Sequence, residues 1–404
     1  MKRVLIFSLA YYPKHVGGAE VAIKEITDRI LPEEIEFHMV CNRYDSTLPK
    51  VEKVGNVVVH RIGLTKKNPS MGDLRAFPLH FNKMLYQFTA FFKALQLHRK
   101  YRYDGVWAMM AHATGVPAGL FKTIHPNTPY LLTLQEGDPL DYIKKKMRFV
   151  YPLFVRAFRK ADMVQVISTF LAGWARDMGF TGVLEVIPNA VNTKHFSKQY
   201  PEAELEAPKK TLGKKEGDVF VITTSRLVHK NAVDDVISAM ALLPEHVHFL
   251  ILGTGPDEMK LKELSQKNGV AERVHFLGQI DHSEMPKYLH ISDIFTRPSR
   301  SEGMGNSFVE AMAAGLPVIA TQEGGIADFL FDEKRNPEKE TTGWAVDSDS
   351  PEQIAEAVKD ILSRPEKVED VKKNAKTLVS AKYDWDLIAN DMKERVFAPL
   401  LKKG

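Results

Sequence analysis

The chain has 404 residues, 44% of them hydrophobic, which is enough to bury two or three cores, and no apolar run reaches the roughly 20 residues that cross a bilayer. A single cysteine, Cys41, excludes an intramolecular disulfide and fits a reducing cytosol, so we expect a cytoplasmic protein that is soluble or rests on a membrane surface. The net charge is only +4, but residues 1–195 hold 27 Lys and Arg against 16 Asp and Glu, so the first half either faces something anionic or carries a chance excess of solvated charge.

Short apolar runs alternate with helical patterns along the whole chain, which is typical of parallel α/β sheets. The strands expected in the first half are 4–8, 37–41, 57–61, 106–109, 130–133, 163–167 and 183–187. The helices expected there are 19–31, 81–100, 114–122, 141–159 and 169–178.

A polar stretch at 194–215, rich in Pro and Lys, interrupts this alternation and is expected to be a linker or an exposed lead-in. A second series follows it, with expected strands at 219–225, 247–252, 274–277, 294–297, 317–320 and 344–346. Two consecutive series predict two Rossmann-like domains, 1–195 and 196–382, with a cleft between them. From residue 350 the chain is helical and charged, and 385–397 is amphipathic.

The most informative segment, 299–320, reads S-R-S-E-G-M-G-N-S-F-V-E-A-M-A-A-G-L-P-V-I-A. It places Glu302 on the turn between an expected strand and an expected helix, and Glu310 inside that helix. In an open α/β sheet this turn lies at the carboxyl edge of the strands, where ligands bind. Bare N–H groups at the helix start attract an anion, and a carboxylate beside them accepts hydroxyl hydrogen bonds. The segment therefore suits a ligand with phosphates and hydroxyls, although Glu310 alone reads equally well as a solvated helix residue.

This string resembles the E-x7-E signature of the retaining glycosyltransferases of family 4 (glycosyl transferases group 1), which have the GT-B fold. The resemblance implies two Rossmann-like domains whose parallel sheets face each other across a cleft, and a C-terminal helix within 383–404 that packs back on the N-terminal domain. It implies that Glu302 contacts the donor sugar and Glu310 the ribose of a nucleotide-diphosphate sugar. The remaining donor-binding positions of this segment are Gly303, Met304, Gly305, Asn306 and Ser307.

The loop after the first strand of the second domain extends the resemblance. Its sequence S-R-L-V-H-K-N, at 225–231, is similar to the family's S-R-L-x-x-K-K-G, whose cations neutralise the leaving phosphate. Arg226 matches that motif. Asn231 stands where the family has its second lysine, so either Lys230 supplies the charge or Asn231 donates a neutral hydrogen bond.

Three further segments match the family in order. Gly17 and Gly18 open a helix and resemble the G-G-x-E loop that family members place over the donor diphosphate. Gly253 and Gly255 lie in an L-G-x-G-P turn that borders the nucleotide in the family. The strand end that meets the base in relatives corresponds to Phe276 and Leu277. Each pattern taken alone is also compatible with a tight structural turn.

The end of the strand at 130–133 is expected to contribute the acceptor side of the site. Gln135 replaces a histidine that contacts the donor sugar in many relatives, which puts that contact in doubt. Glu136 and Asp138 are candidates to orient an acceptor hydroxyl, while Asp138 before Pro139 is equally suited to cap a helix. His112, near another strand end, is a further candidate.

The segment 141–160 holds seven basic residues and one acidic residue. Its apolar positions recur at helical spacing: Ile143, Met147, Val150 and Phe154. We favour a helix whose apolar stripe packs on the sheet, and we regard Lys144–Lys146 as a candidate docking patch for an anionic membrane. No motif for nucleic-acid recognition accompanies this charge, so no nucleic-acid partner is expected.

We interpret the chain as a retaining GT-B glycosyltransferase of the hexosyltransferase type. It would move a sugar from a UDP-, GDP- or ADP-linked donor to a hydroxyl of a glycan, a lipid-linked acceptor or a small molecule. Glu302, Arg226 and Lys230 form the expected catalytic set, and no residue is a secure nucleophile. No cofactor and no metal is expected, because GT-B enzymes generally work without one and no metal-ligand spacing is convincing. The alternatives are a non-catalytic sugar-nucleotide-binding protein and a GT-B nucleotide-sugar epimerase.

Overall fold

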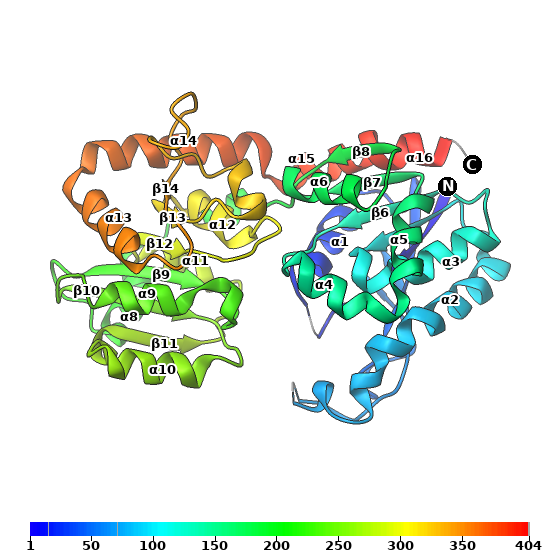
Figure 1. Ribbon diagram of the computed structural model, residues 1–404, viewed down its shortest axis with the longest axis horizontal. Coiled ribbons are helices and arrows are strands. Elements are labelled where there is room, and N and C mark those ends of the chain that lie inside the picture. The colour runs from blue at the N-terminus through cyan, green and yellow to red at the C-terminus, as the bar shows by residue number, and fades with distance from the viewer. Residues whose placement is uncertain (15, 71, 403–404) are drawn as a thin grey trace. The chain divides into compact units, whose positions relative to one another are not determined.

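The computed structural model describes residues 1–14, 16–70 and 72–402. They form two compact units, one of Met1–Asn189 with Trp385–Gly404 and one of Ala190–Asp384 (Figure 1). Each unit contains its own parallel sheet with helices packed on it, so the predicted α/β class is confirmed. The units are called unit 1 and unit 2 below.

Unit 1 is built on an eight-stranded sheet in the order β3-β4-β2-β1-β5-β6-β7-β8. All neighbouring strands are parallel except β3 and β4, which form an antiparallel hairpin at the edge. Strand β1 pairs with β2 on one side and β5 on the other, so the strand order reverses there. In open α/β sheets such a switch point is where ligands bind, at the carboxyl ends of the strands.

The strands of unit 1 are β1 (Lys2–Phe7), β2 (Ile35–Asn42), β3 (Val51–Val54), β4 (Val57–Ile62), β5 (Gly105–Met109), β6 (Tyr130–Leu134), β7 (Met163–Val166) and β8 (Val183–Val186). Its helices are α1 (Gly18–Asp28), α2 (Asn82–Tyr101), α3 (Val116–Ile124), α4 (Leu140–Met147), α5 (Tyr151–Lys160), α6 (Thr169–Asp177), α15 (Trp385–Asp391) and α16 (Ala398–Lys402). Shorter helical turns are η1 (Asp73–Arg75), η2 (Leu79–Phe81), η3 (Ala111–Gly115), η4 (Arg148–Val150) and η8 (Met392–Phe397).

Unit 2 is built on a six-stranded, fully parallel sheet in the order β11-β10-β9-β12-β13-β14. Its strands are β9 (Val219–Thr224), β10 (Val247–Leu252), β11 (Val274–Gly278), β12 (Ile294–Arg297), β13 (Val318–Ala320) and β14 (Trp344–Ala345). Its helices are α7 (Thr193–Phe196), α8 (Glu202–Leu212), α9 (Val233–Met240), α10 (Glu258–Lys267), α11 (Met285–His290), α12 (Asn306–Ala314), α13 (Pro351–Ser363) and α14 (Pro365–Lys382), with short turns η5 (His229–Asn231), η6 (Ala271–Arg273) and η7 (Gly324–Asp328).

Both faces of the unit 2 sheet are covered by helices. On one face α9 contacts both α10 and α13, and on the other α12 contacts both α11 and α14 (Figure 1). Strands buried on both faces read as continuous apolar runs, which is why β10 is V-H-F-L-I-L. The strand order reverses at β9, which has β10 on one side and β12 on the other. The loops after β9 and β12 therefore flank the switch point of this sheet.

The C-terminal segment returns to unit 1, as the fold prediction required. The ring of Phe397 meets the rings of Trp107 and Phe37 edge-on, with centroids 5.3 and 5.7 Å apart. Asp386, at the start of α15, receives a 2.7 Å hydrogen bond from Arg29 at the end of α1. An aromatic anchor in the core and an ion pair at the rim thus hold the last helices on the first sheet.

The structure corrects two predictions. The stretch at 194–215 is not a linker, since it contains α7 and α8, and Pro208 inside α8 obscured the helical pattern; the alternative, an exposed lead-in, fits α8, which buries no residue. The helix expected at 141–159 is two helices, because the 3-10 turn η4 separates α4 from α5 and Pro152 lies at the start of α5. Ile143, Met147 and Phe154 of the apolar stripe are nevertheless buried, as predicted, whereas Val150 is only half-buried.

Candidate functional site

Two loops at the switch point of unit 2 are bound tightly together. The loop after β9 carries Arg226 and Lys230, and the loop after β12 carries Glu302. The Arg300 backbone N–H donates to the Lys230 carbonyl at 2.8 Å. The Arg300 side chain donates twice to Asp234, at 2.9 and 3.0 Å, and once to Asp235 at 2.7 Å. The two segments that the sequence singled out most strongly are therefore one connected structure.

Glycines let the neighbouring loop after β10 approach this pair. A Cβ added at Gly253, whose φ is +144°, would lie 1.9 Å from the Ser225 carbonyl oxygen. A Cβ at Gly255 would lie 2.1 Å from the Leu227 carbonyl oxygen. The Leu227 N–H donates to the Thr254 carbonyl at 3.0 Å across the same contact. The L-G-x-G-P turn is thus required for backbone packing, whatever ligand it also meets.

Arg297, at the end of β12, lies beneath the E-x7-E segment. Its residue surface is only 7% exposed, and its guanidinium donates to the Glu302 carboxylate at 2.7 Å and to the Ser307 hydroxyl at 2.8 Å. The guanidinium also lies over the Phe308 ring, 4.3 Å from its centroid. Burial lowers the pKa of Arg297, and the Glu302 and Glu310 carboxylates oppose that shift. A buried cation therefore holds the first glutamate and interacts electrostatically with both.

The sequence interpretation missed Arg297. Its signal was present, because a charged residue stands in an otherwise apolar strand, I-F-T-R, directly before Pro298. A charge is almost never fully buried unless it is paired. That rule predicts a nearby carboxylate, and Glu302 is the partner found.

The predicted positions after Glu302 are arranged around this cation. Gly303 donates its backbone N–H to the Glu302 carboxylate at 3.1 Å, and Met304 is buried as a whole residue, backbone included. Gly305, with φ +87°, precedes α12, and a Cβ there would lie 2.8 Å from the Arg297 guanidinium. Asn306 is the first residue of α12.

Glu310 lies within α12 and has a histidine partner. His282 Nε2 is 3.4 Å from a Glu310 carboxylate oxygen. The His282 ring stacks on the ring of His195, with centroids 5.7 Å apart and an interplanar angle of 19°. Both histidines were absent from the predicted set, because 87 residues separate them in the chain. Glu310 is therefore not simply a solvated helix residue.

The cations of the β9 loop differ in their surroundings. Arg226 is exposed, and its guanidinium has no hydrogen bond or ion pair within the described part of the chain. Lys230 is half-buried. Asn231 is buried, and its side-chain amide donates to the Arg226 carbonyl at 2.6 Å, so it holds the loop. Arg226 is thus placed to receive an anionic ligand, while the Asn231 amide is already in use.

The remaining donor-side positions lie on β11. Phe276 and Leu277 are half-buried at the end of this strand, and the Lys262 ammonium lies 5.2 Å from the centroid of the Phe276 ring. They occupy the same carboxyl edge as the loops above, at the margin of the sheet.

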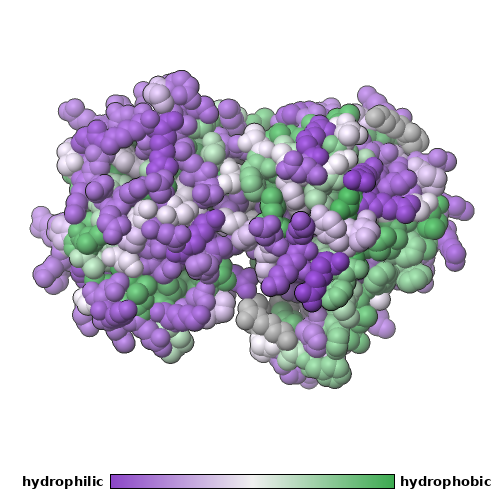
Figure 2. Space-filling view, in the orientation of Figure 1, coloured by the Kyte–Doolittle hydropathy of each residue, from purple (hydrophilic) through white to green (hydrophobic). Residues whose placement is uncertain are grey.

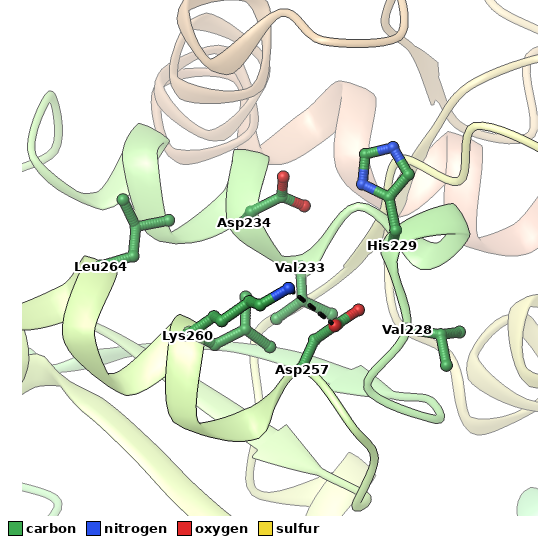
Figure 3. Close-up of a pocket in the computed structure, with 8 residues that line it drawn as sticks. Val228, His229, Val233, Asp234, Asp257, Lys260 and Leu264 are labelled. Carbon is green, nitrogen blue, oxygen red and sulfur yellow. Dashed lines mark ion pairs between the residues drawn. The ribbon is translucent and has the colours of Figure 1, made fainter.

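A cavity of about 330 Å³ lies beside this edge, between α9 and α10 (Figure 3). Lys260 and Asp257 form an ion pair across its rim, with the charged atoms 3.9 Å apart. The residues that line it are Val228, His229, Val233, Asp234, Asp257, Lys260, Leu261 and Leu264. It is lined by neither glutamate of the E-x7-E segment, but Val228 and His229 belong to the loop after β9, so the cavity adjoins the candidate site.

In unit 1 the predicted glycine loop caps a helix. Gly17 is the N-cap of α1, and its backbone N–H donates to the Glu20 carboxylate at 2.8 Å. Burial raises the pKa of Glu20. A Cβ added at Gly18 would meet nothing within 4 Å, so space is open at this helix start. The loop follows β1 and therefore lies at the switch point of the first sheet.

The predicted acceptor-side residues are bonded to their neighbours. Gln135 and Asn189 exchange amide hydrogen bonds of 3.0 and 3.2 Å. The Glu136 carboxylate is fully buried and accepts from the backbone N–H groups of Gln135 and His112, with His112 Nδ1 also 3.2 Å away. Glu136 thus orients His112 instead of facing solvent. Asp138 is half-buried, and the N-cap position of α4 is occupied by Pro139.

Strain accompanies His112. Met110, just before it, has φ +68°, a value that non-glycine residues rarely adopt, and the π-helical turn η3 follows. Such strained turns often mark functional sites.

Within residues 1–14, 16–70 and 72–402, no group of three or more His, Cys, Asp or Glu side chains is gathered to hold a metal ion. Over the same residues, no helix combines the length and apolar character needed to span a bilayer.

Known proteins resemble both units. Residues 206–378 match the family profile described as glycosyl transferases group 1, and residues 16–195 match the one described as glycosyltransferase family 4. A GDP-mannose-dependent alpha-(1-6)-phosphatidylinositol monomannoside mannosyltransferase of Mycobacterium tuberculosis is 30% identical over 240 residues, which are 56% of this chain. The match spans 60% of that relative's length.

Solved structures share the fold of the whole chain. Sucrose-phosphate synthase from Thermosynechococcus elongatus covers 100% of both chains with a TM-score of 0.81 and 21% identity. Anabaena Alr3699/HepE, in complex with UDP and glucose, covers 98% of this chain and 100% of its own with a TM-score of 0.76 and 20% identity. The predicted GT-B fold is confirmed by these likenesses, and the chain belongs to the group 1 glycosyltransferases of the GT-B type.

Proposed function

We propose that the chain is a retaining glycosyltransferase that moves a sugar from a nucleotide-diphosphate donor to a hydroxyl acceptor without a bound metal ion. One observation carries the proposal. At the switch point of unit 2, Glu302 is held by the buried Arg297, and the adjoining loop presents Arg226 with no protein partner in the described residues. This edge offers an exposed cation for a diphosphate and fixed carboxylates for hydroxyl groups.

The proposed chemistry depends on stabilising the leaving group. The bond between the sugar's anomeric carbon and the diphosphate oxygen breaks, and a bond to the acceptor oxygen forms on the same face. The acceptor proton passes to the departing phosphate oxygen. Negative charge builds on the diphosphate, and Arg226 and Lys230 offset it together with the backbone N–H groups of Gly305 and Asn306 at the start of α12. Preorganised donors of this kind are usually the largest single catalytic contribution.

The two glutamates take separate parts of the donor in this proposal. Glu302 accepts hydrogen bonds from the sugar, and Glu310 accepts them from the ribose. Some relatives use GDP-mannose and one structural neighbour was solved with UDP and glucose, which supports a nucleotide-sugar donor. We assign the acceptor hydroxyl to the carboxyl edge of unit 1, near Gln135, Asp138 and His112.

The proposed setting is the cytoplasm, with the acceptor drawn from a glycan, a lipid-linked sugar or a small molecule. The single cysteine, Cys41, is buried and free, which is compatible with a reducing compartment. Because the relatives include a phosphatidylinositol monomannoside mannosyltransferase, a lipid acceptor should be tested first.

A thermal-shift screen of UDP-, GDP- and ADP-sugars tests the donor assignment, followed by donor-dependent nucleotide release with candidate acceptors. We expect one nucleotide class to raise the melting temperature, because a ligand that binds only the folded state stabilises it. Release of the nucleoside diphosphate with transfer of the sugar supports a transferase. Binding without release would instead identify a sugar-nucleotide-binding protein, and a change of sugar configuration without release would identify an epimerase.

Glu310→Gln is expected to weaken nucleotide binding. Hydrogen bonds to a charged group contribute about 1.5–3 kcal/mol each, so the dissociation constant for the nucleoside diphosphate should rise about 10- to 100-fold. Isothermal titration with the nucleotide selected by the screen measures this effect. Glu356→Gln, an exposed glutamate on α13, is the matched control and should bind normally. Unchanged affinity in Glu310→Gln would remove the ribose assignment.

Arg226→Ala is expected to lower kcat about 100-fold or more, as when one stabilising donor is removed from other active sites. Its guanidinium is exposed and has no protein partner in the described residues, so the melting temperature of the ligand-free protein should stay the same. Single-turnover kinetics measures the chemical step directly. Arg226→Lys should recover part of the rate, and Arg156→Ala, an exposed arginine on α5, should have no effect. A normal rate in Arg226→Ala would exclude the diphosphate clamp.

A further inference from the structure

The outward side of α2 in unit 1 is unusually apolar for a surface. Four of its side chains, spaced along one face, are exposed: Met84, Leu85, Phe88 and Phe92. Phe92 is 65% exposed and Phe88 is 46% exposed. We call these four residues the α2 face. Figure 2 shows hydrophobic side chains gathered over α2 on the visible side of unit 1, bordered by a strongly hydrophilic band.

The α2 face is fixed in its outward orientation by the opposite side of the helix. Tyr86 is buried, and its hydroxyl donates to the Val40 carbonyl at 2.8 Å. The Gln87 side chain donates to the Ala113 carbonyl at 3.1 Å. Since the inner side is pinned to the sheet, the helix cannot rotate to bury Phe88 and Phe92. Single exposed apolar residues are common, but a contiguous patch of them marks a site of interaction.

Helix α2 also carries positive charge. Helix α2 contains no Asp or Glu, and its basic residues are Lys83, Lys93, Arg99 and Lys100. Helix α4 of the same unit ends in the exposed lysines Lys144–Lys146. Partial loss of hydration and repulsion from Lys83 lower the pKa of the exposed Lys146, while Asp138 and Glu136 oppose that shift. The hydrophilic band beside the α2 face in Figure 2 lies over the same part of unit 1 as α4 in Figure 1. The basic ends of α2 and α4 therefore form one surface.

An exposed aromatic residue completes the surface beside α4. Phe149, in η4, is 84% exposed, and the Arg148 guanidinium lies 4.5 Å from its ring centroid. Apolar and aromatic side chains ringed by Lys and Arg, with few acids, are the composition of a segment that lies in a membrane interface. The rings enter the boundary between headgroups and acyl chains, and the cations meet anionic lipids.

We propose that the α2 face and the adjoining basic end of α4 dock unit 1 on an anionic lipid bilayer. The charge excludes the simplest alternative occupant, a second copy of the chain. In a two-fold dimer the same patch meets itself, so Lys83 and its basic neighbours would oppose like charges. An anionic bilayer instead satisfies the apolar face and the cations together.

This docking surface would bring unit 1 to the membrane that contains a lipid acceptor. The assignment of a lipid acceptor itself rests on the proposed function. Its test does not use the sugar donor. Full-length protein is sedimented with vesicles of equal parts phosphatidylglycerol and phosphatidylcholine, and with vesicles of phosphatidylcholine alone. We expect binding to the anionic vesicles and little to the neutral ones, with the anionic affinity falling as salt rises.

Two variants separate the contributions of the face and the charges. Phe88→Ser/Phe92→Ser should reduce anionic-vesicle affinity at least 10-fold, since two large rings lose their place in the interface. Lys83→Gln/Lys145→Gln/Lys146→Gln should reduce it about 100-fold, since each cation near an anionic surface contributes about five-fold. All five side chains are exposed, so the melting temperature should not change.

Matched variants in unit 2 provide the controls. Met259→Ser/Leu242→Ser removes apolar side chains that are 67% and 46% exposed, close to the values for Phe92 and Phe88. Lys267→Gln/Lys359→Gln/Lys373→Gln removes three exposed lysines. Both controls should bind vesicles like the original protein. The proposal is overturned if the original protein ignores anionic vesicles, if test and control variants bind alike, or if the Phe variant disperses a dimer without affecting vesicle binding. Nucleotide release with a soluble acceptor, measured in parallel, tests the catalytic proposal independently.

Discussion

Replacing Glu302 by glutamine is expected to lower kcat/KM for sugar transfer by about 100- to 1,000-fold, the range seen when one preorganised group is removed from an active site. Glutamine keeps the size of the side chain but loses the charge that Arg297 holds at 2.7 Å. A neutral amide also presents an N–H₂ group where the sugar hydroxyl should donate. Steady-state kinetics with the donor selected by the thermal-shift screen measures the loss.

Two comparisons decide what the Glu302 result means. Affinity for the nucleoside diphosphate alone should change only a few-fold, because the proposed partner of Glu302 is the sugar. Glu302→Asp should not recover the rate, since the shorter side chain withdraws the carboxylate from both Arg297 and the donor. Turnover close to normal in Glu302→Gln, with the folded protein intact, would contradict the central assignment.

The parallel architecture was predictable because fully buried strands are short apolar runs between helical patterns. The expected strands at 247–252 and 294–297 coincide with β10 and β12. The edge strand β3 was not predicted because its sequence, V-E-K-V, has only four residues and no alternation of apolar and polar positions; it pairs with β4 at the edge of the sheet. Helix α8 was not predicted because it contains Pro208 and buries no residue, so its sequence shows no apolar stripe facing a core.

The backbone positions of the site were predictable, whereas its side-chain partners were not. A strand followed by a glycine turn and a helix fixes Glu302 at the carboxyl edge without knowledge of the rest of the fold. The contacts of Arg297 depend on tertiary structure, since it reaches the Thr224 carbonyl across 73 positions of sequence. Likewise, His112 and Glu136 meet only because β5 and β6 are neighbours in the sheet. The roles proposed for the predicted site residues remain predictions until the variants are measured.

Arg297→Met is expected to cost about 3 kcal/mol of the free energy of unfolding and to reduce transfer by a factor similar to that of Glu302→Gln. Breaking a buried ion pair by removing one partner is strongly destabilising, because it leaves an uncompensated charge. Here Glu302 would lose its counterion, and the Ser307 hydroxyl would lose its donor. Urea denaturation measures the stability, and kinetics at a temperature where the variant is folded measures the rate. Arg297→Lys keeps the charge but not the planar fork, so it should recover more stability than activity.

A double-mutant cycle distinguishes a positioning role from a purely structural one. In Arg297→Met/Glu302→Gln neither charge remains, so the double variant should be more stable than the sum of the single losses predicts, by about 1–3 kcal/mol. Its activity should stay as low as that of Glu302→Gln, because restoring the fold does not restore the carboxylate. Additive losses of stability would mean that the two side chains are not coupled. Normal activity in a folded Arg297→Met protein would mean that Glu302 finds its working position unaided, and the buried cation would then serve the fold alone.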